Sequence, residues 1–169
     1  MNIILTGFMG SGKSSVGKKL ARALNFGFID TDAIIEKDVG MSITTIFKRK
    51  GEPYFREMES KAIALVSMLD NQVIATGGGV PLRETNMQEL ERNGMVVHLK
   101  VSPENVLKRI GHDTSRPLLQ TKDPLETARA ILSKREKAYA RCALSVDTDT
   151  HSVEEIVEKI LQFYKEKIA

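Results

Sequence analysis

Residues 7–14 read Gly-Phe-Met-Gly-Ser-Gly-Lys-Ser, which matches the phosphate-loop pattern G-x-x-x-x-G-K-[ST]. An apolar run of strand length precedes it at residues 2–6, and residues 13–25 carry apolar side chains at helical spacing. Between a strand and a helix, backbone N–H groups and the positive end of the helix dipole converge on an anion. A plain glycine turn before a helix N-cap is the alternative. The context favours a nucleotide site, with Lys13 on the β- and γ-phosphates and the Ser14 hydroxyl on Mg²⁺.

The composition limits the class of protein. The 169 residues suffice for one domain, and the net charge of +3 suits small anionic ligands better than a nucleic-acid backbone. The single cysteine, Cys142, excludes an internal disulfide and fits a reducing compartment. No targeting segment is visible, and no apolar stretch approaches the roughly 20 residues that span a bilayer. We therefore expect a cytoplasmic protein that binds neither nucleic acid nor membrane.

Strand and helix patterns alternate along the chain. The expected strands are residues 2–6, 26–29, 73–76, 95–100 and 143–147. The expected helices lie near residues 13–25, 31–38, 43–50, 55–70, 83–93, 103–110, 124–140 and 152–168. Several of the strands are short and almost wholly apolar. This pattern predicts an α/β fold in which helices cover both faces of a mostly parallel sheet.

Polar residues and glycines follow the expected strands. In a parallel sheet, ligands gather at the carboxyl ends of the strands. Asp30 and Asp32 follow the second strand, and the run Gly77–Gly79 follows the third. Helix capping explains one aspartate but not both. The glycine run implies either a sharp turn or the close approach of a ligand to the backbone. We therefore expect a site where these segments meet the phosphate loop.

Two segments interrupt the alternation. Residues 31–70 form a long helical insertion, in which Arg56 stands beside two aromatic residues. Residues 111–123 are polar, contain glycine and proline and include Arg116, which is typical of a lid or of a disordered loop. Arg56 and Arg135 are weak signals individually because most helical arginines are solvated, yet arginine suits bidentate binding of carboxylate or phosphate. The absence of an Asn-Lys-x-Asp guanine motif favours a small-molecule kinase over a GTPase.

Together, these motifs resemble those of the shikimate kinase family over nearly the whole chain. The most specific segment is Gly40-x-Ser42-Ile43-x-x-Ile46-Phe47-x-x-x-Gly51-Glu52-x-x-Phe55-Arg56-x-x-Glu59. The resemblance implies a single P-loop, nucleoside-monophosphate-kinase-like domain over residues 1–169, with a five-stranded parallel sheet. It also implies a substrate-binding insertion at about 31–60 and a lid at about 111–123. The implied reaction is ATP-dependent phosphorylation of the 3-hydroxyl of shikimate, in aromatic amino-acid biosynthesis, by a monomer.

The resemblance also implies roles for single residues. ATP would be bound by Gly10, Ser11, Gly12, Lys13, Ser14, Ser15, Arg109 and Arg116, with Arg109 beside the adenine. Mg²⁺ would be held by Ser14 directly and by Asp30 through water. Shikimate would be bound by Asp32, Arg56, Gly77, Gly78, Gly79 and Arg135, with the two arginines on its carboxylate. Lys13, Asp32 and Arg116 would be catalytic: Asp32 would hydrogen-bond the reacting hydroxyl, and the two cations would stabilise the transferred phosphoryl group.

Two other functions fit parts of the pattern. A kinase of gluconate, another polyhydroxy carboxylate, would also use an arginine such as Arg56 or Arg135. A regulator that binds a nucleotide without catalysis would keep the fold, although intact Lys13, Asp32 and Arg116 favour an enzyme. Residues 147–152 lack the proline that many members of the family carry near the adenine, so the adenine contacts of this loop stay unassigned.

Overall fold

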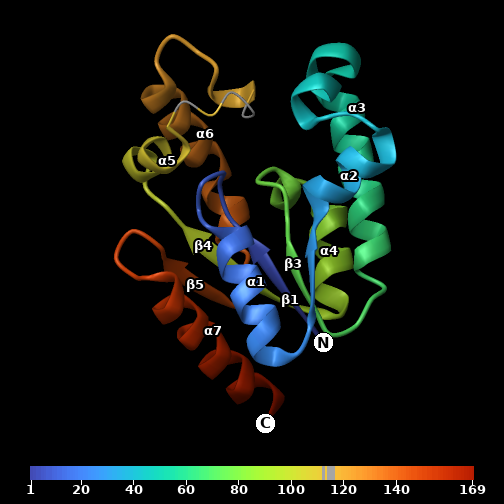
Figure 1. Ribbon diagram of the computed structural model, residues 1–169, viewed down its shortest axis with the longest axis vertical. Helices are drawn as coiled ribbons and strands as arrows, with labels where there is room; N and C mark the ends of the chain where they lie inside the picture. The colour runs from blue at the N-terminus through green and yellow to red at the C-terminus, as the bar shows by residue number, and fades with distance from the viewer. Residues whose placement is uncertain (112, 114–116) are drawn as a thin grey trace.

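The structure is a computed structural model that describes residues 1–111, 113 and 117–169. Its centre is a sheet of five parallel strands in the order β2-β3-β1-β4-β5 (Figure 1). The strands are β1 (Asn2–Thr6), β2 (Gly27–Asp30), β3 (Gln72–Ala75), β4 (Gly94–Lys100) and β5 (Leu144–Asp147). Because β1 lies between β3 and β4, the segment that follows β1 occupies the middle of the carboxyl edge of the sheet.

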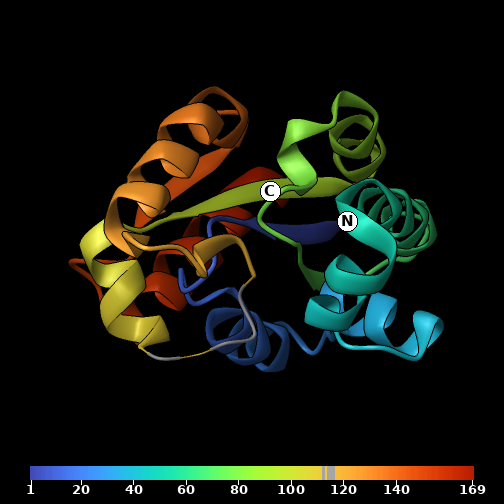
Figure 2. The same cartoon turned by 90° about the horizontal axis from the view of Figure 1, so that it is seen from above.

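Helices cover both faces of this sheet, as Figure 2 shows. They are α1 (Lys13–Leu24), α2 (Thr31–Val39), α3 (Ile43–Val66), α4 (Glu84–Arg92), α5 (Pro103–Ile110), α6 (Pro124–Tyr139) and α7 (Val153–Ile168), with 3₁₀ turns η1 (Val80–Leu82) and η2 (Pro117–Leu119). Ile3 and Leu5 of β1 pack with α1 and α7, whereas Ile4 packs with α3 and α4. Successive side chains of a strand alternate between its faces, so β1 is apolar throughout because both faces are buried.

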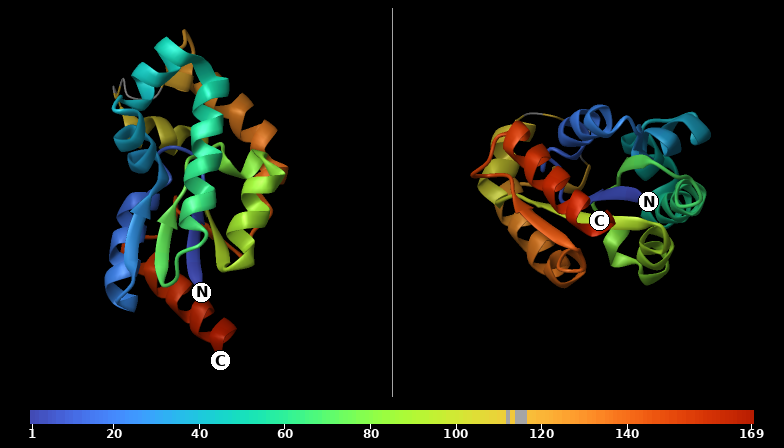
Figure 3. Two further views of the ribbon diagram at one scale, coloured as in Figure 1. Left: turned by 90° about the vertical axis from the view of Figure 1, so that its right-hand side faces the viewer. Right: turned by 90° about the horizontal axis from the view of Figure 1, so that it is seen from below.

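Two groups of helices stand beyond the carboxyl edge of the sheet, one on each side of the segment after β1 (Figure 1). On one side, α2 and α3 enclose an apolar cluster of their own, which includes Ile35, Ile46 and Phe55. On the other side, α5 and α6 pack around Phe8 and Val106. Both chain ends lie at the opposite, amino end of the strands (Figure 3). The sheet edge between the two groups is therefore where a ligand would be enclosed.

The helices are amphipathic. α7, for example, buries Ile156, Ile160 and Tyr164 while its charged side chains face outward. Within the described residues, we find no helix that combines the length and the apolarity needed to cross a membrane.

The predicted alternation of strands and helices is confirmed, and so is the separation between the helices expected at 43–50 and 55–70. The element α3 consists of two helical halves that meet at a kink at Gly51, where φ is 81° and ψ is 167°. Such a positive φ is accessible to glycine at little cost. Pro53 begins the second half, where its missing N–H is tolerated because the first turn of a helix has no acceptor for it.

The end of α3 differs from the prediction. The helix stops at Val66 rather than at residue 70, because the N–H groups of Met68 and Leu69 bond to carbonyls three residues earlier, at 3.4 and 3.2 Å. This tightening of the last turn is common at helix C-termini. Asn71 then adopts a φ of 56°, which turns the chain into β3. A periodic apolar pattern alone does not locate such a turn.

Gly17 is the contact point between α1 and the sheet and provides a test of the packing. A Cβ atom at this position would lie 2.5 Å from Cε2 of Phe28. In an open helix, Gly17→Ala would stabilise the protein by about 1 kcal/mol. Here overpacking, which costs roughly 1–3 kcal/mol, opposes that gain. We expect a net loss of stability in urea unfolding, partly restored by adding Phe28→Leu. A Gly17→Ala protein more stable than the parent would contradict this packing.

Candidate active site

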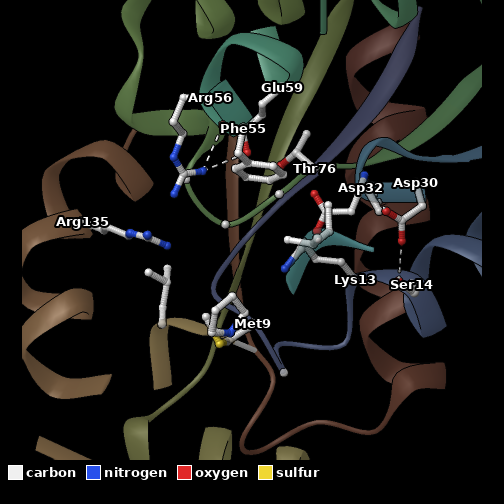
Figure 4. Close-up of a pocket in the computed structure, with 18 of the residues that line it drawn as sticks. Met9, Lys13, Ser14, Asp30, Asp32, Phe55, Arg56, Glu59, Thr76 and Arg135 are labelled. Carbon is white, nitrogen blue, oxygen red and sulfur yellow. Dashed lines mark hydrogen bonds and ion pairs between the residues drawn. The ribbon is translucent and has the colours of Figure 1, made fainter. Parts of the chain in front are cut away.

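A cavity of about 260 Å³ opens at the carboxyl edge of the sheet. Its walls are the loop after β1 with the start of α1, the end of β2 with the start of α2, α3, the glycines after β3, the turn η2 and one side chain of α6. Figure 4 shows Lys13, Ser14 and Asp30 on one side of this cavity and Arg56 and Arg135 on the other. The arrangement therefore joins a candidate phosphate site to a pair of guanidinium groups.

The loop after β1 has the backbone of an anion-binding turn. Gly10 and Gly12 have φ values of 74° and 88°, which disfavour any residue with a Cβ. The Lys13 ammonium donates hydrogen bonds to the carbonyls of Gly7, at 2.8 Å, and Phe8, at 2.9 Å. Lys13 is also the first residue of α1, so the loop backbone and the positive end of the helix meet at one point.

Asp30 serves two partners. One of its carboxylate oxygens accepts a hydrogen bond from the Asp32 N–H at 3.0 Å and so caps α2. The other accepts one from the Ser14 hydroxyl at 3.1 Å. Helix capping and a place in the cavity wall therefore coexist in one residue. A hydroxyl and a carboxylate oxygen are the hard donors that Mg²⁺ prefers, and Mg²⁺ usually takes few protein ligands. Within the described residues, no group of three or more His, Cys, Asp or Glu side chains could hold a metal by itself.

Arg56 is fixed by two carboxylates of its own helix. Its Nη1 donates to both carboxylate oxygens of Glu59, each at 3.1 Å, and its Nη2 donates to Glu52 at 3.0 Å. Glu59 is only 1% exposed. Burial raises the pKa of Glu59, and the nearby Arg56 opposes that rise. No role for either glutamate was predicted from the sequence, although spacings of three and four residues on a helix are the signal for such pairs.

The glycine run after β3 leaves room for these side chains. A Cβ at Gly77 would lie 2.7 Å from a Glu59 oxygen, and one at Gly78 would lie 3.1 Å from Nη1 of Arg135. A Cβ at Gly79 would overlap the Arg56 guanidinium. None of the three glycines has a positive φ. The glycines therefore leave space for charged side chains close to the backbone, and none of them is placed in a turn that only glycine adopts.

Arg135 projects from α6 and is 6% exposed. Its guanidinium lies over the Phe8 ring, 5.7 Å from the centroid, and its Nη1 donates to the Tyr139 hydroxyl at 3.5 Å. That hydroxyl donates to the Gly78 carbonyl at 2.7 Å. Arg135 and Arg56 thus approach the glycine run from different helices, and Figure 4 shows the two guanidinium groups at separate points of the cavity wall.

Arg109 lies outside the cavity wall but contacts the same loop. Its guanidinium donates to the Gly10 carbonyl at 3.0 Å and to the Thr148 hydroxyl and carbonyl at 2.9 and 2.7 Å. Thr148 was not predicted from the sequence to belong to the site. The contact places the segment after β5 next to the phosphate loop, where a nucleotide base would follow the phosphates.

The predicted site residues can now be placed together. Those that line the cavity are Gly10, Gly12, Lys13, Ser14, Ser15, Asp30, Asp32, Arg56, Gly77, Gly78, Gly79 and Arg135. Ser11 is buried beneath the loop, where its hydroxyl accepts a hydrogen bond from Lys13 at 3.4 Å. Arg116 lies outside the described residues.

His98 is a buried polar residue next to this site. Its ring stacks on that of Tyr139, with centroids 4.7 Å apart and 21° between the planes. Its Nδ1 has no hydrogen-bond partner within the described part of the chain. Burial, together with the positive charges of Lys13 and Lys100, lowers the pKa of His98 to about 4, and a hydrogen bond to the Thr6 backbone opposes this. The imidazole is therefore neutral in the folded protein at physiological pH.

Comparison with known proteins identifies the relatives of this chain. A family model described as Shikimate kinase matches residues 9–165. The shikimate kinase of Caldanaerobacter subterraneus subsp. tengcongensis is 45% identical over 163 residues, which cover 96% of this chain and 95% of that protein. The shikimate kinase of Geobacter sulfurreducens is 45% identical over 165 residues, covering 98% and 91%.

Solved structures agree with this relationship. The shikimate kinase from Acinetobacter baumannii, in complex with shikimate, superposes with a TM-score of 0.94 at 35% identity and covers 98% of this chain and 93% of its own. A gluconokinase from Sinorhizobium meliloti superposes with a TM-score of 0.59 at 21% identity, covering 93% and 87%. That lower likeness shows a shared fold and nothing more.

The pKa of His98 predicts how stability changes with pH. Below the ordinary value of 6.5, the unfolded chain takes up a proton that the folded chain refuses until about pH 4. This residue should therefore remove up to about 3 kcal/mol of stability as the pH falls from 6.5 to 4. We expect His98→Phe, which keeps a ring against Tyr139, to lose less stability than the parent in urea titrations over that range. His151→Gln is the control, because His151 lies in an exposed loop. If the free energy of unfolding fell equally with pH in His98→Phe and the parent, the burial of His98 would be contradicted.

Proposed function

Because the chain belongs to the shikimate kinase family, we propose that it transfers the γ-phosphoryl group of ATP to the 3-hydroxyl of shikimate, giving shikimate 3-phosphate and ADP. This reaction serves the pathway to chorismate and the aromatic amino acids. One observation carries the proposal: a single cavity has a phosphate loop on one side and two arginines on the other. Such a cavity suits an acceptor that is both an alcohol and a carboxylate.

On the donor side, the loop backbone and Lys13 hold the β- and γ-phosphates of ATP. Ser14 would bind Mg²⁺ directly and Asp30 would bind it through water, in keeping with their hydroxyl and carboxylate oxygens. When bound, Mg²⁺ would neutralise negative charge on the phosphate groups. To reach the phosphates, the Lys13 ammonium would leave its hydrogen bonds with the Gly7 and Phe8 carbonyls. Those bonds keep the positive charge of Lys13 beside the loop when no ligand is bound.

On the acceptor side, Arg56 and Arg135 bind the shikimate carboxylate, and the backbone of Gly77–Gly79 contacts the ring hydroxyls. Asp32 hydrogen-bonds the reacting hydroxyl and orients it toward the γ-phosphate. Phosphoryl transfer needs positioning and charge stabilisation far more than covalent help from the protein. A carboxylate that orients the nucleophile, together with cations around the transferred group, meets that need.

We assign the segment at about 111–123 as the lid that closes over the site. We assign Arg116, which lies outside the described residues, to the charge of the transferred phosphoryl group, and Arg109 to the adenine side. Exclusion of water by the closed segment protects ATP from hydrolysis. The domain is a single unit over residues 1–169, in which the insertion at about 31–60 carries Arg56. Its separate apolar cluster between α2 and α3 supports this division. We further assign the chain to the cytoplasm as a monomer.

The reaction is tested by ADP release from the purified protein with Mg²⁺ and ATP. We expect ADP release that depends on shikimate and is absent with gluconate. Gluconate is the control because it is also a polyhydroxy carboxylate, and the two arginines alone do not discriminate against it. Turnover with gluconate but not shikimate would reassign the acceptor. Binding of ATP with no turnover on either acceptor would indicate a nucleotide-binding regulator with the same fold.

The carboxylate clamp is tested by Arg56→Ala. Loss of a charged hydrogen bond costs about 1.5–3 kcal/mol, so we expect shikimate affinity to fall at least roughly tenfold, with ATP affinity changed less than about twofold. Arg92→Ala is a matched control, because Arg92 also pairs with a glutamate three residues away but lies on the exposed face of α4. Arg56→Lys keeps the positive charge but loses the two-pronged hydrogen bonding of the guanidinium, so its shikimate affinity should lie between those of Arg56→Ala and Arg92→Ala. Equal losses of shikimate and ATP affinity in a titration calorimeter would remove Arg56 from the clamp.

A further inference from the structure

Tyr139 stands behind the wall of the active-site cavity and does not line it. It is the last residue of α6 and is 4% exposed. Its hydroxyl donates a 2.7 Å hydrogen bond to the Gly78 carbonyl and receives one, at 3.5 Å, from Nη1 of Arg135. A single hydroxyl thus contacts two of the elements assigned to the shikimate carboxylate and ring. Burial raises the pKa of Tyr139, so the phenol remains a donor.

The Tyr139 ring is itself held by the central sheet. It stacks on His98 of β4, and the register of the sheet pairs His98 with Thr6, the last residue of β1. The phosphate loop begins at the next residue. The ring therefore has its position set by the rigid part of the fold and not only by the C-terminal turn of α6, which on its own would fray.

The contact with Gly78 fixes the orientation of a peptide in the cavity wall. In a planar trans peptide, the carbonyl of Gly78 and the N–H of Gly79 point in opposite directions. Because the carbonyl points to Tyr139, the Gly79 N–H points away from it. Within the described residues, the N–H groups of Gly78 and Gly79 have no hydrogen-bond partner in the protein. Two backbone donors are therefore left to a ligand, in a stretch of three glycines whose peptides have few other restraints.

We propose that Tyr139 is a positioning residue for the acceptor substrate: its hydroxyl, braced by the stack on His98, orients the Gly78–Gly79 peptide and the Arg135 guanidinium for shikimate. The proposal rests on the function proposed above. The competing interpretation is that Tyr139 only fills the apolar cluster it shares with Phe8 and Val106. Tyr139→Phe distinguishes the positioning role from the packing role, because it removes the hydroxyl oxygen but keeps the ring and its packing.

The kinetic test compares Tyr139→Phe with Tyr164→Phe. Tyr164 is a matched control, since it is 6% exposed, packs against another aromatic ring and lies in α7, away from the cavity. Loss of one hydrogen bond corresponds to roughly a fivefold change in a binding constant. We expect Tyr139→Phe to raise the KM for shikimate about fivefold, with kcat and the KM for ATP changed less than about twofold, and Tyr164→Phe to change none of these. An unchanged shikimate KM, or equal rises for both substrates, overturns the proposal.

Substitutions of His98 test whether its stack on Tyr139 contributes to the positioning role. His98→Ala removes the stacking surface and should raise the KM for shikimate in the same direction as Tyr139→Phe. His98→Phe restores a ring at that position and should recover most of the loss. Failure of His98→Phe to differ from His98→Ala would remove the stack from the proposal.

A measurement without turnover separates this proposal from the proposed function. The ¹⁵N resonance of Gly79 responds to hydrogen bonding at the preceding carbonyl, so it should shift in ligand-free Tyr139→Phe and stay in place in Tyr164→Phe. No shift overturns the positioning role whichever substrate the enzyme uses. A shift in a protein that does not phosphorylate shikimate would refute the proposed acceptor and retain Tyr139 as the residue that orients this peptide.

Discussion

The site depends on one constraint, which is that parallel strands deliver their carboxyl ends to a single edge. The central place of β1 puts the phosphate loop in the middle of that edge, and β3 brings its glycines alongside. The Thr76 N–H donates to the Leu5 carbonyl at 3.1 Å, which continues the pairing of β3 with β1 up to the first glycine of the run. The proposed phosphate and acceptor sites therefore become neighbours through the pairing of the strands, and α3 and α6 supply side chains from either side.

The two arginines differ in what they contribute. Arg56 is held by Glu52 and Glu59, so its direction is set before any ligand arrives, although its charge is already balanced. Within the part of the chain that the structure describes, no carboxylate forms an ion pair with Arg135, which is nonetheless 6% exposed. Arg135 therefore brings a positive charge to the glycines without a direct ion pair among the described residues, while Arg56 contributes a fixed geometry. A carboxylate ligand would be attracted by Arg135 and oriented by Arg56. Because both side chains are already held in place, binding would cost little side-chain entropy.

Local patterns in the sequence predicted much of this molecule. The strand, glycine loop and helix at residues 2–25 are contiguous, so spacing alone identified them, and the alternation that follows predicted the parallel sheet. The purpose of Gly77–Gly79 was not predictable in the same way, because the guanidinium that excludes a Cβ at Gly79 comes from another helix. The stack of His98 on Tyr139 joins a strand to a distant helix and has no periodic signature. The kink at Gly51 is a local feature, and the sequence pattern did separate the two helical halves that meet there.

Asp30 gives the site a property that no single contact has. The same carboxylate closes the first turn of α2 and faces Ser14 across the nucleotide side. A cation bound at Asp30, as proposed above, would change the free energy of that helix end, and linkage would make the effect reciprocal. Whatever orders the beginning of the insertion would then alter the affinity for that ion by the same factor. One side chain would thereby couple the proposed nucleotide side of the site to the insertion.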